Sequence, residues 1–424
     1  MVLTRRLYGG LTALTALGVG PLFLLHRRGR MRLAERFGGW SLPPGDFVWF
    51  HGASLGEMNG LLPLMRRWKR AYPEIPILAT ATSTTGLERA RGAADEMRLI
   101  PFDSGVFIRR AIGERRIVGF IFGETEIWPG IIGELKKRGV PLFMVNARIG
   151  ERSLRRYRRF RSLFADTFRS LTGVFASSEV DRARLVEVGV ESSRCRTVGN
   201  AKYDLELSAA TEEERRELRC TLSPQGGAIL VLGSLRPGEE RVWFPVLRAL
   251  RNSSATVVVA PRHPEKFDLF AEALTGAQLS FRRWSNGTGS SNPGGLSVIL
   301  LDTLGDLRRF YGAADLAFVG GSLVDWGGHN PLEPALLGVP IATGPYMSSV
   351  EEVTAALDAA EARIVVSNEE EVRALLDRVL RRDPALFEAG ARGCEVARRF
   401  TGVADTIFER IQRGLEEVGG HGGS

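Results

Sequence analysis

The sequence predicts an α/β protein built from two doubly wound parallel-sheet domains, and three observations lead to this fold class. The chain has 424 residues, enough for two or three domains. Hydrophobic residues make up 44% and charged residues 25%, as in globular proteins that bury sizeable cores. Beyond residue 30, short apolar runs that end in Gly, Ser, Thr, Asn or acidic residues alternate with longer amphipathic runs. This alternation is typical of strands and helices in parallel-sheet domains.

The apolar runs form two sets. The strands expected in the first half are Phe47–Phe50, Pro76–Ala81, Met97–Ile100, Ile117–Phe122, Pro141–Val145, Gly173–Ala176 and Arg196–Val198. The strands expected in the second half are Ala228–Leu232, Ala255–Ala260, Ser297–Leu301, Leu316–Val319, Val339–Ala342 and Arg363–Val366. Between the sets, the polar segment Leu205–Pro224 indicates a helix and a linker. We therefore expect domains at residues 31–210 and 211–424, with a C-terminal helix able to pack back on the first domain.

The N-terminal residues differ from the rest of the chain, which has the composition of a soluble protein, because the segment from Leu7 to Leu25 carries no charged side chain. Such a run is just long enough to cross ~30 Å of hydrocarbon. The basic residues that follow it favour a cytoplasmic position for the rest of the chain. A secretory signal of the twin-arginine type is the alternative, although basic residues directly after the apolar run disfavour export. Because Pro21 and several glycines interrupt the run, a segment lying in the membrane interface also stays open. We expect residues 1–30 to be an anchor.

Charge and cysteine content narrow the function classes. Lys and Arg total 57 against 49 Asp and Glu, which gives a net charge of +8. This excess favours an acidic partner, such as a nucleic acid, an anionic membrane or a phosphorylated substrate. Cys195, Cys220 and Cys394 lie far apart and have no zinc-ligand or CxxC spacing. We expect them to be reduced thiols in a cytosolic body.

The loops after the first two strands carry polar motifs. The first is His51-Gly-Ala-Ser-Leu-Gly-Glu57, in which Ser54 and Glu57 have the spacing of a capping box. Glu57 can instead act as a general base, provided that it reaches a substrate hydroxyl. The second loop repeats the cap spacing at Thr85 and Glu88, and its hydroxyls and N–H groups could also bind an anion. Spacing alone leaves both alternatives open at each loop.

Three further loops follow in the first half. Glu124 and Glu126 come after an apolar run, but no His or Asp at a suitable spacing supports a metal site. We instead expect that one of these two carboxylates faces the ligand and that the other orients neighbouring hydrogen-bond donors. Arg148 precedes a basic run from Arg152 to Arg159, which indicates either a solvated helix face or a contact with anionic lipid headgroups. Lys202 follows the last strand expected in the first half, where it could meet developing negative charge.

The second half contains a stronger constellation. The segment 233–240, with Ser234 and Arg236, forms a strand-to-helix turn whose amides could hold a phosphate. Asn330 as N-cap, Pro331 at the first helical position and Glu333 two residues later predict a helix start. The glycine pair at 327–328 would let a nucleotide phosphate approach that helix. Convergence of His329 and Glu333 with Arg262 favours a nucleotide site over an ordinary turn and cap.

As a set, these motifs strongly resemble the 3-deoxy-D-manno-octulosonic acid (Kdo) transferases of lipopolysaccharide synthesis. The motifs that carry the resemblance, in matching order from the anchor to about Glu352, are His51-Gly-Ala-Ser-Leu-Gly-Glu57, Glu124-Thr-Glu-Ile-Trp-Pro129, Asn146-Ala-Arg148, Gly199-Asn-Ala-Lys202, Pro261-Arg-His-Pro264, Asp302-Thr-Leu-Gly-Asp306 and Gly327-Gly-His-Asn-Pro-Leu-Glu333. Ala201, Leu304 and Asp306 depart from residues common in the family. The resemblance implies a GT-B fold with two Rossmann-like domains facing a cleft, the acceptor bound by the first and CMP-Kdo by the second.

The resemblance also implies a mechanism and a set of site residues. Transfer would invert the anomeric centre without a metal ion or other cofactor. Glu57 would take the proton of the attacking hydroxyl, and Glu124 and Lys202 would stabilise the transition state. The implied donor-binding residues are Ser234, Arg236, Arg262, His263, Leu304, Gly305, Asp306, Asn330, Pro331, Leu332 and Glu333. The expected acceptor-binding residues are Ser54, Gly56, Thr85, Arg148 and Arg152.

The implied partners are the CMP-Kdo donor, the lipid A precursor lipid IVA and the surface of the cytoplasmic (inner) membrane, without nucleic acid. Two rival functions stay open. A GT-B transferase that uses a UDP- or GDP-sugar would show the same two-domain pattern. A non-catalytic, membrane-bound protein that binds nucleic acid or anionic lipid would interleave basic and aromatic residues on one face. The aromatic residues here lie mostly inside apolar runs.

Overall fold

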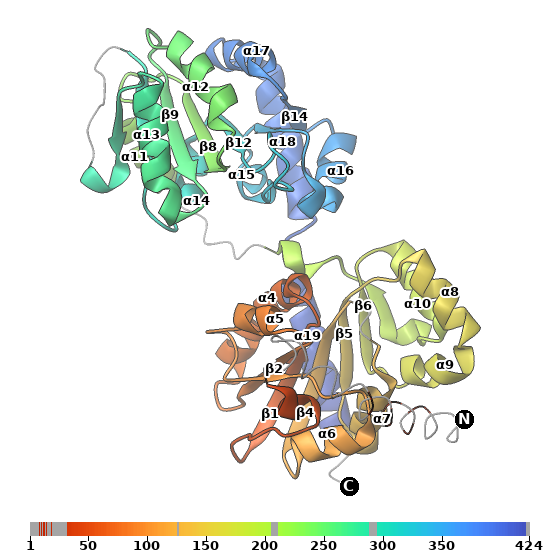
Figure 1. The fold of residues 1–424 in the computed structure, drawn as a ribbon. Helices are drawn as coiled ribbons and strands as arrows, with labels where there is room; N and C mark the ends of the chain where they lie inside the picture. The colour runs from red at the N-terminus through yellow and green to blue at the C-terminus, as the bar shows by residue number, and fades with distance from the viewer. Residues whose placement is uncertain are drawn as a thin grey trace. The chain divides into compact units, whose positions relative to one another are not determined.

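The computed structural model describes residues 32–124, 127–204, 211–287 and 295–420, together with Tyr8, Gly10, Thr12, Leu14 and Gly18. The chain divides into two compact units (Figure 1). The first unit comprises Met1–Glu206 and Phe400–Ser424, and the second comprises Leu207–Arg399. The expected second domain runs to residue 424, whereas the structure assigns its last 25 residues, from Phe400 on, to the first unit.

The first unit is built on a parallel sheet with the strand order β3-β2-β1-β4-β5-β6-β7. Its strands are β1 (Asp46–His51), β2 (Ile77–Ala81), β3 (Glu96–Leu99), β4 (Arg116–Gly123), β5 (Leu142–Ala147), β6 (Gly173–Ala176) and β7 (Cys195–Thr197). Its helices are α3 (Leu33–Arg36), α4 (Leu55–Ala71), α5 (Thr84–Arg89), α6 (Gly105–Ile112), α7 (Pro129–Lys137), α8 (Glu151–Arg159), α9 (Arg161–Arg169), α10 (Glu179–Val188) and α19 (Val403–Gly420), with short 3-10 turns at η1 (Ser192–Arg194) and η2 (Ala201–Tyr203).

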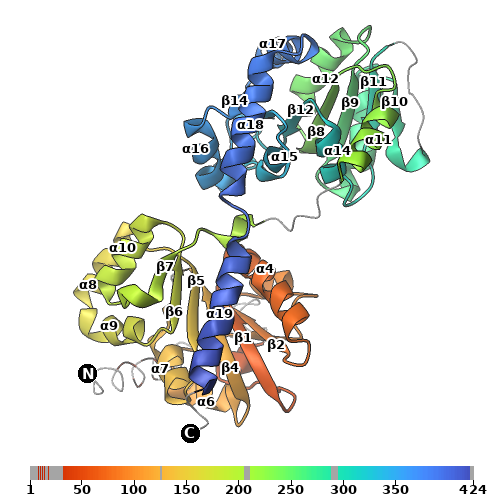
Figure 2. The same cartoon turned by 180° about the vertical axis from the view of Figure 1, so that it is seen from behind.

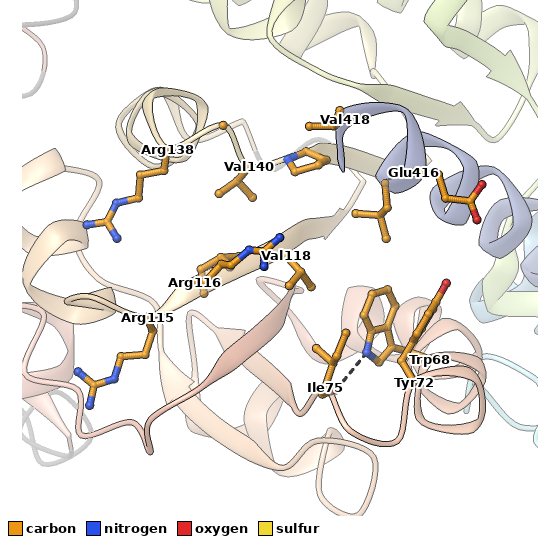
Figure 3. Close-up of a pocket in the computed structure, with 14 residues that line it drawn as sticks. Trp68, Tyr72, Ile75, Arg115, Arg116, Val118, Arg138, Val140, Glu416 and Val418 are labelled. Atoms are coloured by element: carbon orange, nitrogen blue, oxygen red, sulfur yellow. Dashed lines mark hydrogen bonds between the residues drawn. The ribbon is translucent and has the colours of Figure 1, made fainter. Parts of the chain in front are cut away.

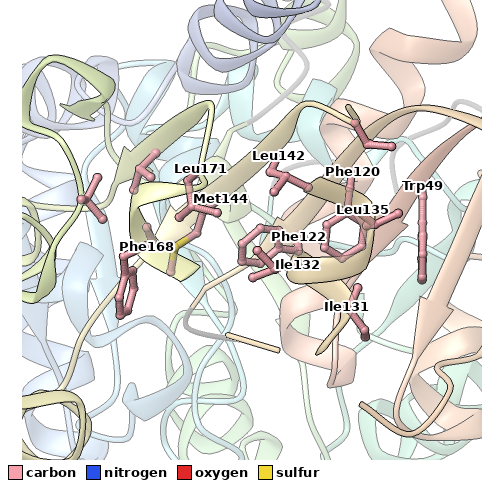
Figure 4. Packing of buried hydrophobic residues seen from close by; sticks show 14 of the residues in the cluster. Trp49, Phe120, Phe122, Ile131, Ile132, Leu135, Leu142, Met144, Phe168 and Leu171 are labelled. Carbon is pink, nitrogen blue, oxygen red and sulfur yellow. The ribbon is translucent and has the colours of Figure 1, made fainter. Parts of the chain in front are cut away.

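Both faces of this sheet are covered, as expected for parallel strands that read as continuous apolar runs. Along β1, Trp49 packs into one cluster, and its neighbours Val48 and Phe50 pack into the other. Figure 4 shows the first cluster, in which Phe120 and Phe122 of β4 lie beside Ile131, Ile132 and Leu135 of α7. The second cluster includes apolar residues of α4 and of α19. Figure 2 shows α19 running along the sheet beside α4.

The second unit repeats the architecture with the strand order β10-β11-β9-β8-β12-β13-β14, again all parallel. Its strands are β8 (Ile229–Leu235), β9 (Thr256–Pro261), β10 (Phe281–Arg283), β11 (Ser297–Leu300), β12 (Leu316–Val319), β13 (Ile341–Thr343) and β14 (Arg363–Val365). Its helices are α11 (Glu212–Leu222), α12 (Glu240–Ala249), α13 (Phe267–Gly276), α14 (Leu307–Ala313), α15 (Leu332–Leu336), α16 (Glu351–Ala359), α17 (Glu369–Leu380) and α18 (Pro384–Arg398), with 3-10 turns η3 (Pro264–Lys266), η4 (Trp284–Asn286) and η5 (Ser348–Val350). Two apolar clusters cover the two faces of its sheet.

Every strand predicted from an apolar run is present, with ends that differ by a few residues. The strand that the sequence does not predict is β10, because two of its three residues are arginines and only Phe281 is apolar. The predicted segment Leu205–Pro224 contains α11, while residues 205–210 lie outside the described residues. The anchor predicted over residues 1–30 also falls almost entirely outside them. Within the described part of the chain, no helix is both long and apolar enough to span a bilayer. The cysteines, all described, form no disulfide.

Candidate functional site

The turn from β1 into α4 holds Glu57 at the carboxyl edge of the first sheet. Ser54 is the N-cap, and its Oγ accepts a hydrogen bond from the Glu57 amide at 3.2 Å. The Glu57 carboxylate accepts the amide of Ala53 at 2.8 Å and the Ser54 hydroxyl at 3.2 Å. The predicted cap is therefore present, although the carboxylate reaches one residue beyond the position of a capping box. Glu57 is half-buried, so the cap does not remove it from solvent.

The end of β4 passes beside Glu57. A Cβ on Gly123 would lie 3.5 Å from the Cβ of Glu57, an ordinary van der Waals distance, so the two residues are close neighbours. Glu124, which follows directly, has a left-handed backbone with φ 50° and donates its amide to Val145 at 2.9 Å. The predicted companion Glu126 lies outside the described residues. The structure thus brings the Gly123–Glu124 backbone and Glu57 together at one edge of the sheet.

Asn146 holds α4 and the Ala201–Tyr203 turn together. It is buried, its Nδ2 donates to the Gly60 carbonyl at 3.3 Å, and its Oδ1 accepts the Ala201 amide at 2.8 Å. A Cβ on Gly60 would lie only 2.5 Å from that Nδ2, which explains the glycine. This clamp places the exposed Lys202 beside Gly60, one helical turn after Glu57 on α4. Sequence reasoning did not give Asn146 this role.

The expected acceptor-binding residues are spread more widely. Of the two alternatives for Thr85, the cap is excluded, because Ser83 is the N-cap of α5 and its Oγ accepts the Gly86 amide at 3.2 Å. A hydroxyl two residues earlier in the chain can meet the first orphan amides of the helix, whereas Thr85 already lies inside it. Thr85 and Gly56 are exposed. Arg148 is exposed after β5, and Arg152 lies on the exposed face of α8.

His51, which the sequence analysis did not single out, is fully buried at the end of β1. Its Nδ1 lies 2.9 Å from the Thr80 hydroxyl and 3.1 Å from the Thr80 carbonyl. Burial lowers the pKa of His51 to about 3, so the ring is neutral at pH 7. Its edge faces Trp128, with ring centroids 6.1 Å apart. The signal available in the sequence was a histidine at the end of an otherwise apolar strand.

In the second unit, Glu239 occupies the matching turn between β8 and α12, and it is fully buried. Its Oε2 accepts the amides of Arg236 and Gly321, both at 2.8 Å. Its Oε1 accepts the amides of Ser322 at 2.9 Å and Leu323 at 3.0 Å. Burial raises the pKa of Glu239, and the four amides oppose this by stabilising the charged form. One carboxylate thereby joins the β8–α12 turn to the loop after β12.

Two of the amides of segment 233–240, which the sequence suggests could hold a phosphate, are occupied by side chains in this structure. The Arg236 amide is taken by Glu239, and the Gly238 amide donates to Glu240 at 2.7 Å. Ser234 is half-buried with φ 56°. The Arg236 guanidinium lies over the Trp326 ring, 4.9 Å from its centroid.

Charged groups converge beside this turn. Burial and the nearby charges of Arg262, Arg236 and His263 lower the pKa of His329 to about 4. Burial raises the pKa of Glu333, and the positive charges of Arg308 and Arg262 act against that rise. Arg262 therefore influences the pKa of both groups. A buried Tyr311, whose pKa is raised by burial and by Glu333, lines the same region.

The predicted start of α15 needs a small correction. The helix begins at Leu332, so Pro331 occupies the cap position expected of Asn330. The Asn330 side chain still accepts the Leu332 amide at 3.0 Å, which is the hydrogen bond that a capping residue makes. Since α15 ends at Leu336, its dipole is weak, and an anion here would depend on side chains more than on the helix.

The predicted loop after β11 is open to solvent. Leu304 is 76% exposed, and Gly305 has φ 91°. The Asp306 carboxylate accepts the Thr303 hydroxyl at 2.5 Å and pairs with Arg309 at 3.4 Å. Throughout the ranges that the structure describes, no group of three or more His, Cys, Asp or Glu side chains is placed to hold a metal ion.

Comparison with known proteins identifies the family. Residues 31–205 match the model of the 3-deoxy-D-manno-octulosonic-acid transferase family. The chain is 31% identical to the 3-deoxy-D-manno-octulosonic acid transferase of Haemophilus influenzae over 94% of this chain and 95% of that one. It is 30% identical to the enzyme of that name from Bordetella pertussis, over 96% of this chain and 99% of the relative. The crystal structure of Acinetobacter baumannii MurG matches 88% of this chain and 100% of the MurG chain, with 13% identity and a TM-score of 0.56. This likeness shows the two-domain GT-B type of fold. The chain therefore belongs to the 3-deoxy-D-manno-octulosonic acid transferase family and is a glycosyltransferase of that family.

Proposed function

We propose that this transferase moves Kdo from CMP-Kdo to the lipid A precursor lipid IVA in lipopolysaccharide biosynthesis, with inversion at the anomeric carbon. The observation that carries the proposal is the position of Glu57. It is a half-buried carboxylate at the carboxyl edge of β1, where ligands of open parallel sheets bind. Membership of the family supplies the transferred sugar. The donor nucleotide and the acceptor are the parts that need an experiment.

On the acceptor side, Glu57 accepts the proton of the sugar hydroxyl while the hydroxyl oxygen bonds to the anomeric carbon. The bond from that carbon to the CMP oxygen breaks, and its electron pair leaves on the phosphate. General-base assistance of this kind contributes ~10²–10⁴-fold in rate. Lys202, beside α4 one turn from Glu57, and Glu124, next to Gly123, stabilise the transition state. Ser54, Gly56, Thr85, Arg148 and Arg152 contact the acceptor.

On the donor side, side chains rather than amides hold the CMP phosphate. Arg262 is exposed and carries a positive charge beside His329 and Glu333. His329, with its pKa lowered to about 4, is neutral at pH 7 and can donate or accept a hydrogen bond without adding charge. The phosphate is also met by His263 and Arg236. The loop from Leu304 to Asp306 and the Asn330–Glu333 segment contact the nucleotide.

We also propose that the enzyme works at the cytoplasmic face of the inner membrane, with residues 1–30 as its anchor, residues 31–210 binding the acceptor and the following residues binding the donor. The apolar run from Leu7 to Leu25 and the basic residues after it support this location. The exposed basic face of α8 can add attachment to anionic lipid. Removing residues 1–25 is then expected to release the protein from membranes in high salt.

The test is transfer itself. Full-length protein is incubated with CMP-Kdo and tetraacyl lipid A precursor, and the lipid product is weighed by mass spectrometry. We expect a mass increase of one or more Kdo residues, and inhibition by CMP but not by UMP. Transfer from a UDP- or GDP-sugar with no use of CMP-Kdo would replace this proposal with the rival GT-B reaction. A folded protein that transfers no sugar and only binds anionic lipid or nucleic acid would support the non-catalytic rival.

A further inference from the structure

The first unit contains a pocket at the edge of the sheet opposite to Glu57. It has a volume of about 640 Å³ and lies among the last turn of α4, the start of β4, the end of α7 and the end of α19. Trp68, which lines it, follows Glu57 by eleven residues on α4. At 1.5 Å per residue, this places the two about 16 Å apart along the helix. The pocket is therefore separate from the proposed acceptor site.

The two sides of this pocket differ in character, as Figure 3 shows. Trp68 of α4 and Tyr72, which directly follows α4, lie on one side. Leu415 and Val418 of α19 also line the pocket. The Trp68 indole donates to the Ile75 carbonyl at 3.1 Å, and Gln412 donates to the Tyr72 hydroxyl at 3.0 Å, so both aromatic walls are held in place. Val418 is 40% exposed. This side offers an apolar floor.

Arginines gather on the other side. The Arg115 guanidinium donates to the Leu42 carbonyl at 2.6 Å, and Arg138 donates to the Gly113 carbonyl at 3.0 Å. These carbonyl partners orient the guanidinium groups without cancelling their charge, although Arg138 also pairs with the buried Glu134 carboxylate at 3.9 Å. The Arg116 side chain is 75% exposed and lies 3.4 Å from Asp46, a distance and exposure at which pairing is weak. Glu416 is the acidic side chain in the lining, against three arginines.

We propose that this pocket binds an anionic amphiphile, a molecule with a single apolar chain and a phosphate or carboxylate head. The head would lie among Arg115, Arg116 and Arg138, whose planar guanidinium groups suit such oxyanions. The chain would lie between the Trp68–Tyr72 wall and Leu415 with Val418. The pocket has the size and mixed lining of small-molecule sites. The arginines favour an anionic head over a neutral lipid, and the apolar side favours a molecule with an apolar chain over a purely polar anion.

The experiment uses the full chain in phosphatidylcholine nanodiscs, with empty nanodiscs as the blank, and octyl phosphate as the probe in calorimetry. We expect saturable binding. Hexyl phosphate should bind about tenfold more weakly, because it lacks two CH₂ groups. Octyltrimethylammonium, with the same chain and the opposite charge, should not bind. Octyl sulfonate should behave like octyl phosphate, since the head is recognised by charge.

Variants locate the site. The double variant Arg116→Glu with Arg138→Glu should weaken octyl phosphate binding at least tenfold. Val418→Glu, on the exposed apolar rim, should do the same without touching the arginines. Arg161→Glu reverses one charge on exposed α9, outside the pocket, and should leave binding unchanged. Unchanged binding in the first two variants, equal binding of octyltrimethylammonium, or loss of binding in Arg148→Ala would overturn the proposal, the last by moving the amphiphile to the acceptor site.

Discussion

Glu57 and Glu239 occupy the same place in the two units and have opposite environments. Each follows the first strand of its unit, at the turn into the next long helix. Glu57 accepts the Ala53 amide and the Ser54 hydroxyl from its own turn and stays half-buried. Glu239 accepts four backbone amides, three of them from the loop after β12, and is fully buried. A carboxylate has about four acceptor positions, so the amides occupy those of Glu239.

The difference shows that the same strand-to-helix turn can hold a carboxylate in a structural role or leave it near solvent for chemistry. In the second unit, the loop after β12 folds back over the turn and buries the carboxylate, which then fixes two loops. In the first unit, the turn is capped locally, and the carboxylate stays near solvent. The fold supplies the position at the sheet edge, while the neighbouring loop decides whether the group is structural or available for chemistry.

The largest effect on stability is expected when Glu239 loses its charge. In Glu239→Gln, the side-chain oxygen can still accept two amides, but its NH₂ group faces the other two. Each buried donor left without an acceptor costs about 1–3 kcal/mol, so we expect a loss of ~2–6 kcal/mol in the free energy of unfolding. Urea unfolding measures this loss. The control is Glu240→Gln, whose side chain accepts one amide, that of Gly238. Equal losses in both variants would contradict the structural role of Glu239.

A second variant tests whether side chains bind the CMP phosphate, since the Arg236 and Gly238 amides already donate to acidic side chains. Arg262→Ala should weaken CMP binding by ~1.5–3 kcal/mol, the range for a hydrogen bond to a charged group, which is about 10- to 150-fold in affinity. Calorimetry with a chelator present measures it. Arg248→Ala, on the exposed end of α12, is the control and should bind CMP normally. If the Arg262 variant bound CMP as tightly as the parent, Arg262 would not hold the phosphate, and backbone amides would be its more important ligands.

Low pH should destabilise both units, because each contains one buried histidine with a lowered pKa, His51 in the first and His329 in the second. The pKa values of His51 and His329 are about 3 and about 4 in the folded protein, below the unfolded value near 6.5. Between these limits the unfolded chain binds more protons, so stability falls as the pH drops below 6.5 and is unaffected by these groups above it. Each histidine contributes at most ~1.4 kcal/mol per pH unit. Urea midpoints from pH 7 to 5 measure the slope, which should flatten in His51→Asn and His329→Asn. An unchanged slope in both variants would refute the assignment.

The sequence predicted the fold more completely than the site. Buried strands such as β1 and β9 are continuous apolar runs, because both faces of a parallel sheet are covered, and they were found. β10 was missed because an edge strand needs less apolar sequence. Ser54 and Glu57 were recognised from local spacing. The role of Glu239 depends on amides more than eighty residues away, and that of Asn146 on Gly60 and Ala201, so no local pattern could reveal either.

The central claim is that the half-buried carboxylate of this pair, Glu57, is the base of the transfer reaction. The most direct test is the kcat of Kdo transfer by Glu57→Gln at saturating CMP-Kdo and lipid A precursor, in protein shown to be folded and to bind CMP. The account predicts a fall in kcat of ~10²–10⁴-fold with unfolding and CMP affinity close to those of the parent, since the amide cannot accept the hydroxyl proton but preserves the shape of the turn. A folded Glu57→Gln protein with near-normal kcat would contradict it and would leave Glu57 as a helix cap alone.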